Sequence, residues 1–187
     1  MSKIGRKPIN LDDVQVEVFG KKISYKGPHD MGTYELPEVL DAVVEENQLK
    51  LVPPKKYASM SRKIKRKINQ TWGLNRALLA NKMQGAAREF VQKIEINGLG
   101  YKASKVGKNL QFSLGYSHKI DFKLPEMVSI EIDKSGKNLT VKSCDKFLMG
   151  KVCSEIKLLR LPEPYKGTGI KLEKEEIRRK AGKTKAA

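Results

Sequence analysis

An internal repeat constrains the fold more than any other feature of this 187-residue sequence. The run Thr-Tyr-Glu-Leu-Pro-Glu at 33–38 is matched 88 residues later by Asp-Phe-Lys-Leu-Pro-Glu at 121–126. The sequences on either side of the two runs share the same order of alternating apolar residues and turn residues. Because self-similarity at a fixed offset reflects a repeated structural unit, the chain is expected to contain two copies of one small fold.

Both copies show the pattern of antiparallel strands. Val14, Val16 and Val18 alternate before a turn at 20–22, and Leu110 and Phe112 alternate after a turn at 107–109. Polar breaks at 45–48 and 135–138 separate further pairs of apolar runs. Alternation with a period of two places one face of each strand on a core, so each copy is expected to form hairpins.

Each copy is also expected to end in a helix. Apolar residues recur every four positions from Met60 to Trp72, with basic residues on the other faces. Gly73 is expected to interrupt this helix before it continues. In the second copy, Asp145 can cap a helix that runs to Leu159.

These patterns predict an α+β fold made of two tandem copies of a small domain, each an antiparallel sheet packed against one helix. We expect an N-terminal repeat domain at residues 1–84, a C-terminal repeat domain at 85–170 and a basic C-terminal tail at 171–187. Domains of roughly 100 to 200 residues are usual, so each of these two domains would have a modest core.

The charge of the chain is high and uneven. Lysine and arginine number 38 against 21 acidic residues, which gives a formal charge of +17. Residues 1–54 carry 7 basic and 9 acidic side chains, whereas residues 55–94 carry 11 and 1. The block from Lys55 to Lys67 has no acidic partner within helical reach, which indicates a surface that binds phosphate. A merely solvated surface is the alternative.

Several classes of protein are excluded by the composition. No run reaches the roughly 18 consecutive apolar residues that a membrane helix needs, and the start lacks the apolar core of a signal peptide. A cytoplasmic protein without a membrane partner is therefore expected. Cys144 and Cys153 match neither a disulfide framework nor a zinc ribbon, so they are expected to be reduced, semi-buried fillers.

Motifs for catalysis or cofactor binding are weak. Residues 98–103 fit the dinucleotide pattern G-x-G-x-x-A, but a turn between strands follows where that motif needs a helix. His29 and His118 lie far apart, and neither has the companion that a zinc site on a helix needs. Ser117 beside His118 is too little to indicate a nucleophile with its base. No enzyme activity, cofactor, metal or small-molecule substrate is therefore expected.

The segment at 162–170 has two prolines that hold the chain extended and two glycines that let backbone amides approach a ligand. Tyr165 can stack on a base or ribose, and Lys166 and Lys171 can reach phosphates. A linker is the alternative reading of such a stretch. The tail beyond it is similar to basic extensions that become ordered only on RNA, and its predicted RNA contacts are Arg178, Arg179, Lys180 and Lys183.

Five stretches together resemble the bacterial type of the sixth large-subunit ribosomal protein family, namely residues 1–9, 26–28, 97–103, 114–118 and 162–170. The resemblance covers essentially the whole chain. It implies two tandem copies of one fold that bind large-subunit ribosomal RNA near the sarcin–ricin loop and the factor-binding region, beside neighbouring large-subunit proteins. The chain departs from the family at Thr168, where a lysine is usual, and at 53–67, which is richer in basic residues.

The resemblance also implies which residues contact RNA. They lie in a hairpin, on the second helix and in the segment after it: Tyr116, His118, Lys119, Lys151, Lys157, Arg160, Tyr165, Lys166, Gly167, Gly169 and Lys171. The sequence thus predicts a cytoplasmic structural constituent of the large ribosomal subunit that supports translation and holds RNA segments together through phosphate contacts. A free-standing RNA chaperone and a basic enzyme acting on nucleic acid are the alternatives.

Overall fold

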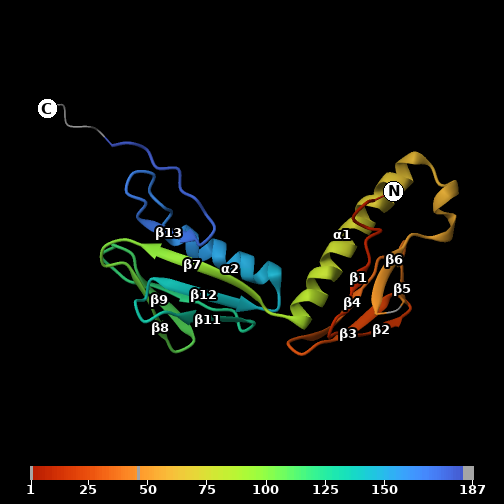
Figure 1. Cartoon of the computed structure of the whole chain (residues 1–187), viewed down its shortest axis with the longest axis horizontal. Coiled ribbons are helices and arrows are strands. Elements are labelled where there is room, and N and C mark those ends of the chain that lie inside the picture. The colour runs from red at the N-terminus through yellow and green to blue at the C-terminus, as the bar shows by residue number, and fades with distance from the viewer. Residues whose placement is uncertain (1, 46, 183–187) are drawn as a thin grey trace. The chain divides into compact units, whose positions relative to one another are not determined.

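The computed structural model describes residues 2–45 and 47–182, and the chain divides into two compact units, Met1–Glu89 and Phe90–Ala187 (Figure 1). Each unit combines antiparallel strands with one α-helix, α1 in the first and α2 in the second. The predicted α+β class is therefore confirmed. Helix α1 continues to Ala87, so the change of unit comes directly after its last turn.

The N-terminal unit contains two three-stranded antiparallel sheets and α1. The sheets have the orders β1-β6-β5 and β2-β3-β4. Their elements are β1 (Ile9–Asn10), β2 (Gln15–Phe19), β3 (Lys22–Lys26), β4 (Met31–Glu35), β5 (Asp41–Glu45) and β6 (Gln48–Val52), followed by the 3-10 helix η1 (Lys55–Ser59) and α1 (Arg62–Ala87).

The C-terminal unit repeats this arrangement with one strand added. Its sheets have the orders β8-β9-β10 and β11-β12-β7-β13, and all neighbouring strands are antiparallel. The elements are β7 (Phe90–Asn97), β8 (Lys102–Val106), β9 (Asn109–Ser113), β10 (Ile120–Lys123), β11 (Val128–Ile132), β12 (Asn138–Ser143), α2 (Lys146–Leu159) and β13 (Gly169–Leu172).

The strand orders confirm the repeat seen in the sequence. The order β1-β6-β5 of the first unit matches β7-β12-β11 of the second, and β2-β3-β4 matches β8-β9-β10. The strands of each copy divide into two small sheets, a division that period-two alternation alone does not show. Strand β13 extends the larger sheet of the second unit by pairing with β7.

Helix α1 differs from its prediction in two respects. Gly73 does not interrupt it, because the helix is continuous over its 26 residues. A side chain at this glycine would meet the Ser2 hydroxyl at 3.1 Å, so the small residue allows the N-terminal segment to lie close to the helix. The buried stripe also starts later than predicted: Ile64 is 51% exposed, and the first buried helix residue is Ile68.

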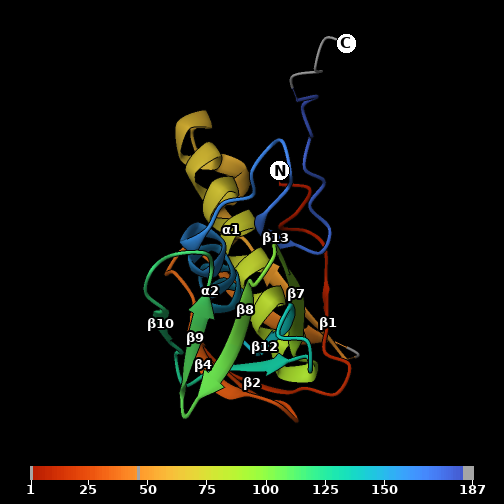
Figure 2. The ribbon, with the colours of Figure 1, turned by 90° about the vertical axis from the view of Figure 1, so that its left-hand side faces the viewer.

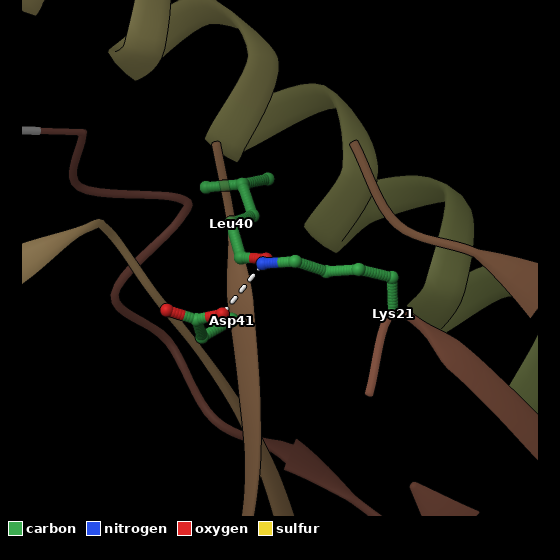
Figure 3. Close-up of polar contacts among 3 residues, drawn as sticks. All are labelled: Lys21, Leu40 and Asp41. Carbon is green, nitrogen blue, oxygen red and sulfur yellow. Dashed lines mark hydrogen bonds and ion pairs between the residues drawn. The ribbon is translucent and has the colours of Figure 1, made fainter. Parts of the chain in front are cut away.

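The core of the N-terminal unit forms where α1 packs on the strands. Trp72 is 3% exposed, and its indole N–H donates to the carbonyl oxygen of Leu51 at 3.0 Å. The two sheets are also joined at their edges by Lys21, whose ammonium donates to the carbonyl oxygen of Leu40 at 2.7 Å and pairs with Asp41 at 2.6 Å (Figure 3). The apolar face of α1 is thus buried within the unit, and its other faces remain exposed to solvent.

The core of the C-terminal unit lies between α2 and the sheets. Val152 and Ile156 of α2 are buried with Leu139 and Val141 of β12. Neither Cys144 nor Cys153 forms a disulfide within the described residues, and burial raises the pKa of the Cys153 thiol to about 11, as expected of a structural filler. The described residues contain no helix long and apolar enough to cross a membrane.

Asp145 caps α2 as predicted, because its carboxylate accepts from the amides of Phe147 at 2.9 Å and Leu148 at 3.4 Å. Replacing Asp145 by alanine should lower the free energy of unfolding of the C-terminal unit by about 1 kcal/mol, since these amides lose their partner. Hydrogen exchange of the α2 amides measures this loss within the full chain. Asp145→Asn is the matched control, since it keeps a capping oxygen, and equal protection in the alanine and wild-type proteins would contradict the prediction.

Candidate nucleic-acid interface

The segment between α2 and β13 is a folded loop rather than a linker. The amide of Glu163 donates to the carbonyl oxygen of Thr168, and the amide of Gly167 donates to that of Glu163, both at 2.9 Å. The Thr168 hydroxyl donates to the Glu163 carboxylate at 3.0 Å. These bonds close residues 163–168 on themselves, so Tyr165 and Lys166 are carried at a defined position and remain exposed.

Both glycines of this loop are favoured by a positive φ, and Gly169 is also required by close packing against backbone. Gly167 has φ +72°, and a side chain there would lie 3.0 Å from the guanidinium of Arg179. Gly169 has φ +139°, and a side chain there would lie 2.6 Å from the carbonyl oxygen of Leu161. The Gly167 amide is already used inside the loop, so these residues shape the backbone. A direct contact of Gly167 or Gly169 with RNA stays a prediction.

The segment after β13 is attached to this loop. The amide of Lys180 donates to the carbonyl oxygen of Pro164 at 2.9 Å, and the amide of Glu173 donates to that of Lys93 at 3.1 Å. The loop and the start of the tail extend from the same end of the C-terminal unit (Figures 1 and 2). Residues 173–182 form no helix or strand, yet they are tied to the unit at several points. Lys183 lies outside the described residues.

A cluster of one cation and two aromatic rings lies at the C-terminal end of α2. The guanidinium of Arg160 sits 4.9 Å from the centre of the Tyr116 ring, and the His118 ring is stacked on Tyr116 with centres 6.1 Å apart. The Tyr116 hydroxyl donates to the carbonyl oxygen of Leu159 at 3.2 Å, which fixes the loop between β9 and β10 against the helix end. The cluster therefore joins residues from two segments that are far apart in the sequence.

This cluster is suited to a phosphate or a base. A hydrogen bond to the Tyr116 hydroxyl raises the pKa of the Arg160 guanidinium, so this guanidinium stays charged. Tyr116 is 42% exposed and Tyr165 is 54% exposed, which leaves ring surface for stacking. Tyr116, Arg160 and Thr168 line one hollow of about 550 Å³, together with Glu163 and residues 158, 159 and 161.

Three of the predicted RNA-contacting lysines are engaged by acidic side chains. Lys157 pairs with Glu175 at 2.6 Å, Lys171 with Glu95 at 2.7 Å and Lys151 with Glu155 at 4.0 Å. The hydrogen bond from Lys157 holds the pKa of the Glu175 carboxyl below its usual range, so this pair is ionised at neutral pH. Lys171 and Glu95 face each other across β13 and β7. The Lys157 pair connects α2 to the tail and the Lys171 pair connects β13 to β7, whereas the Lys151 pair lies within α2.

The remaining predicted cations are the ones most available to phosphate. They are exposed and form no ion pair with an acid in the part of the chain that the structure describes: Lys119, Lys166, Arg178, Arg179 and Lys180. All except Lys119 belong to the loop after α2 or to the tail. The predicted cations that remain available therefore lie mostly in the loop after α2 and in the tail.

Residues that support this surface were not predicted from the sequence. The Tyr101 ring packs where side chains at Gly98 and Gly115 would lie, at 2.6 Å and 2.9 Å, and so fixes the turn after β7 beside the loop after β9. Glu163 and Glu175 organise the loop and the tail. A search for cations and aromatic residues alone does not find such acids.

The same part of the chain offers little to a metal or a nucleotide. Among the described residues, no group of three or more His, Cys, Asp or Glu side chains is placed to hold a metal ion. The segment after Gly98 forms strand β8, so the G-x-G-x-x-A pattern does not open a helix. The groups that this part of the chain does present are charged, aromatic and hydrogen-bonding side chains.

Comparisons with known proteins agree with this arrangement. A family model described as Ribosomal protein L6 matches residues 97–173. A protein of Syntrophomonas wolfei named large ribosomal subunit protein uL6 is 42% identical over 187 residues, which cover 98% of both chains. Proteins of the same name are 38% identical over 188 residues in Anaeromyxobacter sp. strain Fw109-5, covering 100% of both chains, and 39% identical over 187 residues in Natranaerobius thermophilus, covering 98% of this chain and 99% of that one.

These identities extend over both units, so they confirm the family inferred from the five sequence stretches. The strand orders provide independent support, since both units have the same antiparallel arrangement with one helix. The chain belongs to the ribosomal protein L6 family.

Proposed function

We propose that this protein is a structural constituent of the large ribosomal subunit and binds large-subunit ribosomal RNA through the end of its C-terminal unit. The relatives are named as large-subunit proteins, and membership of this family makes the chain a structural component of the ribosome rather than an enzyme. The observation that carries the RNA proposal is that Tyr165 and Lys166 are exposed on a folded loop. The tail attached to this loop carries Arg178 and Arg179, which form no ion pair among the described residues.

The mechanism follows from the two kinds of group on this surface. Lys166, Arg178 and Arg179 neutralise closely spaced phosphates, and each contact releases counterions from the RNA. The aromatic rings stack on bases or riboses that leave the duplex. Because the loop is closed before RNA arrives, little conformational freedom is lost on binding. Contacts made by the loop and by the tail can hold separate RNA segments together.

The location within the subunit is the finer part of the proposal. The motif resemblance supports a site near the sarcin–ricin loop and the factor-binding region, where neighbouring large-subunit proteins are the other partners. Any influence on translation factors is then indirect, because the protein supports the RNA that those factors touch. Comparing chemical footprints of the ribosomal RNA with and without the protein tests this location, and protection elsewhere would overturn it.

The assignment to the subunit is tested by sedimentation. In a cell lysate at moderate magnesium, the tagged protein should move with large subunits through a sucrose gradient, because many phosphate contacts hold it there. A high-salt wash should release part of it, since counterion release makes the binding salt-dependent. A protein that stays at the top of the gradient would instead be a free-standing RNA chaperone.

The role of the unpaired cations is tested by charge reversal. The variant Lys166→Glu/Arg178→Glu should enter subunits poorly and should lower the slope of log affinity against log salt for large-subunit RNA by about 2. Lys171 is left unchanged, because its reversal would place two carboxylates across β13 and β7. Lys105→Glu/Lys108→Glu, at exposed positions at the end of β8 and in the turn before β9, is the matched control. Equal losses in both variants would contradict the proposed surface.

Stacking by Tyr165 gives a further prediction. Tyr165→Ala should weaken RNA binding by about 1 to 3 kcal/mol if a base stacks on the ring, whereas Tyr165→Phe should bind nearly as well as wild type. Affinity measured at one fixed salt concentration separates these variants, because neither substitution changes the charge. If phenylalanine costs as much as alanine, the hydroxyl rather than the ring makes the contact.

A further inference from the structure

A second basic surface lies in the N-terminal unit, where the sequence predicts phosphate binding without a known partner. We define the α1 basic surface by seven side chains on η1 and the first two turns of α1: Lys55, Lys56, Arg62, Lys63, Lys65, Arg66 and Lys67. No acidic residue occurs between positions 48 and 88. Six of the seven side chains are exposed, and Lys65 is half-buried.

Other lysines of the same unit are neutralised internally. Lys21 pairs with Asp41 (Figure 3), Lys22 with Glu35 and Lys50 with Glu45, at 2.6, 3.2 and 2.6 Å. Within the described residues, the α1 basic surface forms no such pair. Its internal bond is from the Lys65 ammonium to the carbonyl oxygen of Ala58, at 2.8 Å. The charge of this surface is therefore left for an external partner.

The surface has a defined hollow of about 640 Å³, lined by Ser2, Tyr57, Arg62, Lys65, Arg66, Asn69 and Gln70. Asn69 organises its floor, since its side-chain oxygen accepts from the Ser2 amide at 3.2 Å and from the Tyr57 hydroxyl at 3.0 Å. The N-terminal segment, η1 and α1 are thereby joined at one place. The cations therefore lie on folded elements around a preformed hollow, and not on an extended tail.

The arrangement is unfavourable for the isolated protein. Arg62 and Arg66, and likewise Lys63 and Lys67, are like charges four residues apart on one helix, which repel each other. They also lie near the helix N-terminus, where the macrodipole disfavours cations and where no acidic residue compensates. The basic residues thus destabilise the start of α1, and local destabilisation of this kind is common at binding sites. A bound polyanion would relieve the repulsion.

We propose that the α1 basic surface binds the phosphate backbone of RNA, as a second RNA contact separate from that of the C-terminal unit. Arg62 and Arg66 are about 6 Å apart along the helix axis, which lets them reach successive phosphates of one strand. Asn69 also lines the hollow, and because its side-chain oxygen accepts bonds from Ser2 and Tyr57, its amide nitrogen is the group that can donate to a ligand.

An acidic protein fits this surface less well than RNA does. Protein interfaces have an apolar centre and are depleted in lysine, whereas interfaces with nucleic acid are polar and strongly positive. Four of the seven residues that define the surface are outside the hollow lining, and these are all lysines. The apolar exposure of the same helix turns is limited to Ile64. The composition therefore favours a partner with evenly spaced phosphates.

The test uses the full-length protein and a 20-base-pair RNA duplex of arbitrary sequence as the probe. The variant Arg62→Gln/Lys63→Gln/Arg66→Gln/Lys67→Gln should lose about ten-fold or more in affinity, and its salt slope should fall by about 2 or more. The variant Lys102→Gln/Lys105→Gln/Lys108→Gln/Lys134→Gln removes the same number of exposed charges from the C-terminal unit and should change affinity by less than about two-fold.

Folding of the α1 variant is checked by the fluorescence of Trp72, the sole tryptophan, which lies in the same N-terminal unit. Removal of the like charges should leave the unfolding temperature of the N-terminal unit equal or higher, so lost binding cannot be attributed to misfolding. Equal affinity losses in the two quadruple variants would overturn the proposal, because they would reflect net charge alone. Poly-L-glutamate serves as a second probe that mimics an acidic protein. If the α1 variant loses affinity for poly-L-glutamate but not for the RNA duplex, the proposal is overturned in favour of an acidic protein partner.

The result is independent of the C-terminal surface. If the α1 variant binds the duplex like wild type while Lys166→Glu/Arg178→Glu does not, the second contact is refuted and the proposed function stands. If only the α1 variant loses duplex binding, the second contact is supported, and the C-terminal proposal is judged by the binding of its own variant to large-subunit RNA. Losses in both variants, each beyond its own control, support two separate contacts.

Discussion

Burial of one helix face against small antiparallel sheets is the interaction on which both units depend. In the first unit Ile68, Trp72 and Leu79 of α1 enter the core, and in the second unit Val152 and Ile156 of α2 do so. A three-stranded sheet needs such a partner, because it cannot otherwise bury its apolar face. Since packing uses one side of each helix, the other sides and the helix ends can carry charge without disturbing the core.

The charges on those free sides are used in two different ways. Around α2 and β13, acidic residues engage Lys157 and Lys171, so that loop and tail are held in place. Around the start of α1 no acid is available within the described residues, and the cations remain unbalanced. An exposed ion pair adds little stability, but it changes what a lysine can offer to phosphate.

Local sequence patterns predicted a large part of this structure. The repeat, the hairpins and the Asp145 cap depend on residues close in sequence, and all three are present. Helix α1 was predicted with an interruption at Gly73, because a glycine weakens an isolated helix. The structure shows instead that this glycine accommodates the N-terminal segment. The glycine is explained by its contact with Ser2, which is 71 residues away in sequence. The periodicity of the helix does not reveal a contact of this kind.

The sequence by itself determined that the protein is a tandem repeat with a basic second half of its first unit and a basic tail, since composition and periodicity are properties of neighbouring residues. It also indicated the aromatic and basic residues from which an RNA surface is built. Only the tertiary structure decided which of them lie together and which cations are unpaired. Arg160 meets Tyr116, and Lys171 meets Glu95, because strands and loops distant in the chain become neighbours only after the cores form.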